Sequence, residues 1–251
     1  MADTIVLALI GGAWLGPLLW LLAVSLGSPQ GDLSLGPGLD NYRYLWDHGQ
    51  LGPIWNSTVI GVSTGVLAVP AGFLVAYEAQ QARAAPLLWT LVLYKAVPAS
   101  ALAIAAFGLA RFMALPNSML LPLMLIVLSN LFLAVLLVFV ALRRLPRRLF
   151  DAMRVDGLSP LQQRLTVASL VRAELLAVFI LMFLLAWGEG FLTGVLTPHG
   201  LRPLSAEMMT FTTSFGAYWG RLAALSAVSL VPCLLVGPLL LAMMLRLGER
   251  R

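Results

Sequence analysis

The residues best suited to recognition or chemistry form one polar segment, "RRLPRRLFDAMRVDG", which runs from Arg143 to Gly157. Five of its fifteen residues are arginine and two are aspartate, whereas the whole chain of 251 residues is 60% hydrophobic and only 11% charged. The apolar residues among these charges are Leu149, Phe150, Met153 and Val155. This combination is typical of a short amphipathic helix that contacts a membrane surface or another protein.

We expect this helix to begin at Pro146, because the first turn of a helix does not need the backbone N–H that proline lacks. It should end at Gly157, since glycine readily adopts the left-handed conformation of a helix stop. On such a helix Arg147, Asp151 and Arg154 share one face with opposite charges adjacent. Leu149, Phe150 and Met153 lie together on another face. The residues alone leave two interpretations open: an anchor whose arginines contact anionic lipid, and a knob that docks into a groove on a cytosolic partner.

A second group of polar residues lies within apolar stretches, where such groups usually face the protein interior or a watery cavity. Lys95, the only lysine, is near the middle of its stretch and could line a solute path or pair with a neighbouring helix. The other candidates for a solute path are Tyr94, Ser129, Asn130, Trp187 and Glu189. Hydrogen bonds between helices are an open alternative for these residues, and an interfacial aromatic belt is one for Trp187.

Little else in the chain suggests chemistry. The single cysteine, Cys233, and two distant histidines, His48 and His199, predict no metal site. The apolar stretches hold neither paired acids nor histidine, which argues against a membrane enzyme. The sequence also lacks a G-x-x-x-x-G-K-[ST] motif, so we expect no ATPase site in this chain and no cofactor bound by it.

The composition places the chain in a membrane, because soluble domains carry about 25% charged residues. A helix needs about 20 mainly apolar residues to cross the hydrocarbon core. Six stretches meet this test: Thr4–Leu26, Ser57–Tyr77, Leu87–Ala110, Met119–Leu142, Glu174–Leu196 and Leu222–Leu245. We therefore expect an all-α membrane protein with one domain over residues 1–251 and the polar segment in the loop 143–172, between the fourth and fifth spans.

The basic residues predict the orientation. With six spans, eleven of the sixteen fall on the side of both termini and the loop 143–172, and four fall on the other side. Since positive charge is retained in the cytoplasm, both termini and this loop should be cytoplasmic. The same clustering argues against a nucleic-acid partner. No internal repeat of the kind found in many self-sufficient carriers is present.

The segment "LPRRLFDAMRVDGLSP" resembles the EAA loop of binding-protein-dependent ABC importer permeases, usually written E-A-A-x-x-D-G-A. The matching positions are Asp151, Ala152, Met153, Asp156 and Gly157. Four further segments resemble segments of sugar permeases and occur in the same order as in that family. They are "LDNYRYLW", "WNSTVIGVSTGVLAVPAGFLVAYEAQQARA", "YKAVPAS" and "AWGEGF". The chain departs from the family in its shorter leading acid, in the bulkier Met153 and Leu158, and in lacking the downstream prolines.

The resemblance implies a type I ABC importer permease of the carbohydrate class, similar to the maltose-type second permease, in the bacterial plasma membrane. Its coupling helix would contact the ATPase through Leu149, Phe150, Asp151, Ala152, Met153, Arg154, Asp156, Gly157 and Leu158, with the Met153 side chain filling a cleft. It further implies a second homologous permease chain, two cytosolic ATPase subunits that bind ATP and Mg, and an extracytoplasmic solute-binding protein. The implied solute is a sugar or a sugar-like molecule, and a polyamine, thiamine or an anion is the alternative.

Overall fold

The computed structural model describes residues 2–28, 35–82, 97–113, 120–196, 202–213 and 216–249. The helices are α1 (Ala2–Ser25), α2 (Asp40–Asp47), α3 (Pro53–Gln81), α5 (Ala99–Phe112), α6 (Leu120–Leu142), α7 (Arg147–Val155), α8 (Pro160–Leu170), α9 (Arg172–Trp187), α10 (Phe191–Leu196), α11 (Leu204–Met208), the 3-10 helix η1 (Met209–Phe211) and α12 (Trp219–Glu249). Two short antiparallel strands, β1 (Thr212–Thr213) and β2 (Gly216–Ala217), pair Thr212 with Ala217 and Thr213 with Gly216.

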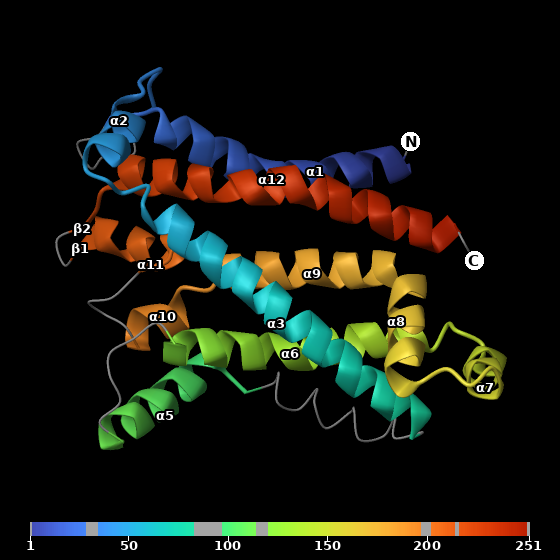
Figure 1. Cartoon of the computed structure of the whole chain (residues 1–251). Helices are drawn as coiled ribbons and strands as arrows, with labels where there is room; N and C mark the ends of the chain where they lie inside the picture. The colour runs from blue at the N-terminus through green and yellow to red at the C-terminus, as the bar shows by residue number, and fades with distance from the viewer. Residues whose placement is uncertain are drawn as a thin grey trace.

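The long helices run side by side, with α7 and α8 at one end of the bundle and α2, α10, α11 and the two strands at the other (Figure 1). The start of α1 and the end of α12 lie at the same end as α7 and α8. We call this the inner end, following the distribution of basic residues, and the opposite one the outer end. The shared end of α1, α12 and α7 is the arrangement expected if the chain ends and the loop 143–172 face the same side of a membrane.

Among the described residues, three helices are long and apolar enough to cross a membrane: α3, α6 and the Trp219–Met243 part of α12. The pair α8 and α9 passes the same test together, although the two helices meet at 76°. Gly11–Ser25 of α1 and Ser100–Phe112 of α5 are shorter apolar helices. The prediction of an all-α membrane protein is confirmed, whereas the number of six spans stays a prediction.

Most predicted spans agree with a helix. α6 begins one residue after the predicted start and ends at the predicted residue, and α3 and α12 extend past their predicted spans at both ends. Of the third predicted span, residues 87–96 lie outside the described residues, and α5 continues two residues past its predicted end.

The prediction that the fifth span is one continuous helix over Glu174–Leu196 is wrong. α9 ends at Trp187, and the chain resumes a helix only at Phe191. Two glycines flank Glu189 in the break, and glycine weakens a helix because it has the most conformational freedom to lose. The Glu189 carboxylate then accepts a 2.9 Å hydrogen bond from the backbone N–H of Leu192, in the first turn of α10.

Small residues let α3 pack closely against both α6 and α9, which it crosses in the view of Figure 1. A Cβ built at Gly61 would come within 2.7 Å of the Phe183 ring on α9. One at Gly65 would come within 2.6 Å of the Phe179 ring. Close approach at small residues is the usual way in which membrane helices pack, so these glycines set the distance between α3 and α9.

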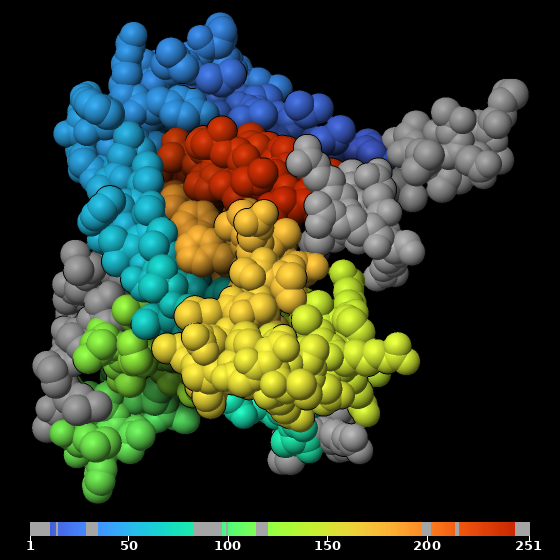
Figure 2. Space-filling model, turned by 45° about the vertical axis from the view of Figure 1, so that its right-hand side comes forward, coloured from blue at the N-terminus to red at the C-terminus, as the bar shows by residue number. Residues whose placement is uncertain are grey.

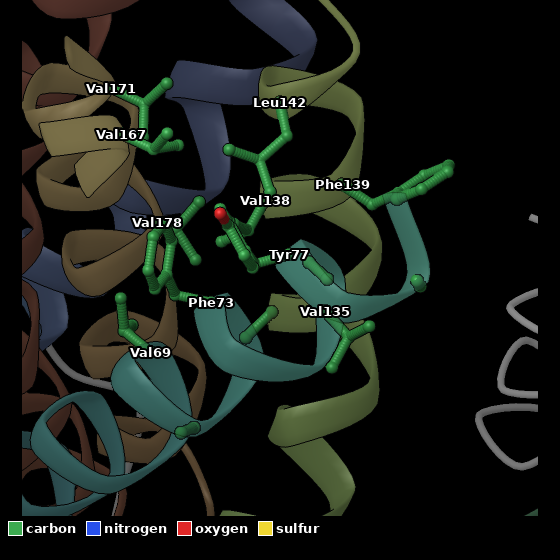
Figure 3. Packing of buried hydrophobic residues seen from close by; sticks show 14 of the residues in the cluster. Val69, Phe73, Tyr77, Val135, Val138, Phe139, Leu142, Val167, Val171 and Val178 are labelled. Carbon is green, nitrogen blue, oxygen red and sulfur yellow. The ribbon is translucent and has the colours of Figure 1, made fainter. Parts of the chain in front are cut away.

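The largest apolar cluster fills the inner half of the bundle. Figure 3 shows part of it, with Val69, Phe73 and Tyr77 from α3, Val135, Val138, Phe139 and Leu142 from α6, Val167 from α8, Val171 at the bend, and Val178 from α9. Residues of α7 join the same cluster. The core therefore continues from the spans into the segment that carries the polar motif.

At the outer end, α2 joins α1 to α12. The amide of Asn41, which is fully buried, donates hydrogen bonds to the backbone carbonyls of Ser25 (3.1 Å) and Gly27 (2.9 Å). The guanidinium of Arg221 on α12 lies 3.6 Å from the centre of the Tyr44 ring, a cation–π contact. These contacts fix the end of α1 against the start of α12.

Candidate functional site

The polar segment folds as predicted into a short helix, α7. Pro146 precedes it in an extended conformation, and Gly157 follows it with a φ of 71°. The N–H of Gly157 donates to the carbonyl of Arg154, and the N–H of Leu158 donates to that of Met153, each over 3.1 Å. These are the two hydrogen bonds of a Schellman motif, which requires the left-handed residue that glycine supplies.

The apolar face of α7 is used within the chain. Phe150 and Met153 are only 5% and 4% exposed and pack into the core cluster, where the Phe150 ring lies 6.2 Å from the Tyr77 ring of α3. Leu149 and Leu158 are partly buried against the same cluster. The expectation that the Met153 side chain fills a cleft on a partner is therefore wrong for this conformation, because the bundle already occupies that side of the helix.

The opposite face of α7 is open. Asp151, Ala152, Arg154 and Asp156 are exposed, and Val155 is 87% exposed. An ion pair of 3.6 Å joins Arg154 to Asp151 on this face, but both groups are solvated, so it adds little stability.

Two contacts tie the inner end of α3 to the loop helices. The guanidinium of Arg154 on α7 donates a 2.8 Å hydrogen bond to the side-chain oxygen of Gln81. The guanidinium of Arg164 on α8 forms a 2.7 Å ion pair with Glu78. Together with the buried Phe150, these contacts attach α7 and α8 to the end of α3. Figure 2 shows α7 and α8 as one continuous yellow to yellow-green surface.

Four further arginines extend this surface: Arg143, Arg144, Arg147 and Arg148. All are exposed, and none forms an ion pair with a residue that the structure describes. They follow directly on α6, where a span would leave the membrane, so the anchor interpretation still applies to this part of the segment.

Of the predicted residues of the solute path, the structure describes Ser129 and Asn130 on α6 and Trp187 and Glu189 at the end of α9. Tyr94 and Lys95 lie outside the described residues. Ser129 is half-buried on α6. Asn130 is buried beside it, and its amide donates to the carbonyl of Ile126 over 2.8 Å. These positions therefore favour contacts within the helix bundle in this conformation.

Trp187 and Glu189 lie at the outer end of α9, and both have structural partners. The Trp187 ring is 5% exposed, and its indole N–H donates over 3.1 Å to the carbonyl of Ser229 on α12. Such a ring cannot stack on a solute in this conformation. Glu189 holds the first turn of α10, as described above.

The structure also contains a cavity that the sequence did not predict. It has a volume of about 530 Å³ and lies at the outer end, between the break in the fifth span and α11. Its lining residues are Gly188, Gly190, Phe191, Gly194, Val195, Arg202, Ser205, Ala206, Met209 and Thr210. The spacing of the three glycines, inside a stretch otherwise apolar enough for a span, is the signal that could have indicated a break here.

The first turn of α3 holds one wall of this cavity. The side-chain amide of Asn56 donates a 2.8 Å hydrogen bond to the backbone carbonyl of Arg202. The hydroxyl of Ser57 accepts one of 2.8 Å from the backbone N–H of Leu204. One helix, about 43 Å long at 1.5 Å per residue, therefore contacts the cavity wall at its outer end and α7 and α8 at its inner end.

The sequence matches no family model and no curated protein. Its structure, in contrast, is similar to a chain in the crystal structure of a bacterial ABC transporter involved in the import of the acidic polysaccharide alginate. The two superpose with a TM-score of 0.68 and 16% sequence identity, over 96% of this chain and 94% of that chain. At this identity the similarity shows a shared fold, and it extends over nearly the whole length of both chains.

Proposed function

We propose that this protein is the permease subunit of a bacterial ABC importer, and that it forms half of the path for a sugar or a sugar-like solute. The observation that carries the proposal is the fold shared with a chain of an alginate-importing ABC transporter over 96% of this chain. The motif D-x-x-x-x-D-G at Asp151–Gly157 supports it independently, because the motif forms an exposed helix beyond the spans.

In this proposal the open face of α7 binds a cytosolic ATPase subunit, which holds ATP and Mg. Ala152 and Val155 provide apolar contact there, and Asp151 and Asp156 provide charge. When the ATPase subunit moves, the buried face of α7, with Phe150 and Met153, transmits that movement to the bundle. A rigid-body rotation of packed helices then alternates access to the path, as in other hinge and shear movements.

In the proposed complex this chain has six spans, and both of its termini are in the cytoplasm. The other subunits outside the ATPase are a second homologous permease chain and an extracytoplasmic solute-binding protein. A second chain is needed because one bundle of this size encloses little space for a path.

The substitution Gly157→Asp tests the proposal. It places a side chain and a negative charge on the docking face, at a φ that favours glycine. We expect the complex purified from native membranes to lose its ATPase subunit and its solute-stimulated ATP hydrolysis, while the variant chain still inserts into the membrane.

Gly49→Asp is the matched control. Gly49 has a φ of 66°, and neither glycine has another atom within 4 Å of its built Cβ, but Gly49 lies at the outer end, after α2. The control should retain both the ATPase subunit and transport. Normal uptake by Gly157→Asp would remove the proposed docking role of α7.

A further inference from the structure

The outer cavity lies where a predicted span is interrupted. Backbone that is not helical is tolerated at membrane depth only where it is buried in protein or lines a water-filled cavity. Both glycines of the break, Gly188 and Gly190, line the cavity. The interruption is therefore part of the wall of this cavity.

The cavity combines a cation with hydroxyl groups. Arg202 lines it from the segment before α11, and a guanidinium has five N–H donors in a fork that matches a carboxylate. The Ser205 hydroxyl is buried and has no hydrogen-bond partner among the described residues. Thr210 also lines the cavity, and its hydroxyl donates to the Glu207 carbonyl over 2.7 Å, which leaves its oxygen able to accept.

Apolar side chains complete the lining. Phe191 and Met209 are both exposed and line the cavity, and Val195 and Ala206 are further lining residues. An aromatic ring next to a few polar groups suits a sugar ring, which has an apolar face and hydroxyl groups at its edge. At about 530 Å³ the cavity is within the range of small-molecule sites.

We propose that this cavity is a binding site for one unit of a sugar that carries a carboxylate, a uronate. Arg202 pairs with the carboxylate, the hydroxyls of Ser205 and Thr210 bind sugar hydroxyls, and Phe191 contacts the apolar face of the ring. The inference rests on the proposed transport function and names the class of its solute. The site is also in contact with α3, because Asn56 and Ser57 form the hydrogen bonds to the cavity wall described above. The other end of α3 contacts α7 and α8, where the ATPase is proposed to bind.

Cysteine protection tests this site directly, because the chain has a single cysteine, Cys233, which is exposed and can be replaced. In a Cys233→Ser background, Gly194→Cys places a thiol in the lining. Among the described residues there is room for it, since a Cβ at Gly194 would meet only Ala206, at 4.0 Å. The thiol is labelled in spheroplasts of cells that express the whole complex, with a reagent that does not cross the membrane.

We expect a triuronate at millimolar concentration to slow this labelling at least threefold, and the neutral sugar maltotriose to leave it unchanged. Asp47→Cys, at the exposed end of α2, should be labelled at one rate under all conditions. Adding Arg202→Gln should abolish the protection, and adding Arg202→Lys should retain part of it.

Three results would overturn the inference: no labelling of Gly194→Cys from outside, equal labelling with and without the triuronate, or equal protection by maltotriose. The measurement needs no ATP hydrolysis. A failure of the ATPase docking proposal would therefore leave the protection intact, and loss of protection would leave the docking proposal intact.

Discussion

Arg164 on α8 and Glu78 at the inner end of α3 form an ion pair of 2.7 Å between residues 86 positions apart in the sequence. Together with the Arg154–Gln81 hydrogen bond, this contact attaches both loop helices to one span. The same span holds the wall of the outer cavity through Asn56 and Ser57. α3 thus directly contacts both the loop helices at the inner end and the cavity wall at the outer end. The proposed transport cycle requires these two regions to move together.

Breaking the Arg164–Glu78 pair should reduce coupling more than stability. Both side chains are substantially exposed, and an exposed ion pair contributes about 0.2–1 kcal/mol. We expect Glu78→Gln and Arg164→Gln each to lower the ratio of solute transported to ATP hydrolysed in proteoliposomes. The thermal unfolding midpoint of the complex should shift little.

The exchanged pair, Glu78→Arg with Arg164→Glu, is the control and should recover most of that ratio. A normal ratio of solute transported to ATP hydrolysed in either single variant would contradict this prediction. The Arg164–Glu78 contact would then not be needed to link α8 to α3.

The glycines of α3 should be sensitive to a single methyl group. In Gly65→Ala the new Cβ would come within 2.6 Å of the Phe179 ring, so the ring or α9 must shift, at about 1–3 kcal/mol. Gly108→Ala on α5 is the matched change, because no atom of a described residue lies within 4 Å of its Cβ. The latter should be neutral or stabilising by up to about 1 kcal/mol, since alanine favours a helix over glycine.

Thermal unfolding in detergent compares the two variants. Combining Gly65→Ala with Phe179→Leu should recover part of the loss, because the smaller side chain gives way to the methyl group. Equal midpoints for Gly65→Ala and Gly108→Ala would contradict the packing described for α3 and α9.

The Trp187 indole should matter for stability and not for selectivity. Trp187→Phe keeps an aromatic ring but removes the donor to the Ser229 carbonyl, and a lost hydrogen bond of this kind costs about 1 kcal/mol. Competition assays with a panel of sugars should give the same order of preference as the unaltered protein. A changed order would mean that the ring reaches the solute in another conformation, contrary to its burial here.

The parts of the structure that were predictable depend on local signals. Pro146 and Gly157 determine where α7 begins and ends, and both act within one or two residues of themselves. The spans of α3, α6 and α12 follow from the length of apolar runs, which a window of about 20 residues detects. The orientation of the chain, which follows from a count of basic residues, stays a prediction.

What was missed depends on contacts between distant segments. The burial of Met153 follows from the position of α3 and α6 behind it, and the apolar pattern of α7 cannot distinguish an internal core from a partner. The break at Gly188–Gly190 was hidden because apolar residues on both sides keep the average hydropathy high. The outer cavity joins two segments, and only the fold brings Arg202 beside Gly190.

The most direct test of the central claim is a crosslink from the open face of α7. Val155→Cys, in the Cys233→Ser background, is 87% exposed and lies between the two aspartates of the motif. With a short thiol-reactive crosslinker applied to native membranes, the account predicts a covalent product with a cytosolic ATPase subunit, whose yield changes when ATP is added. A thiol that is labelled from outside the cell, or that yields no such product in a transport-competent complex, would contradict it.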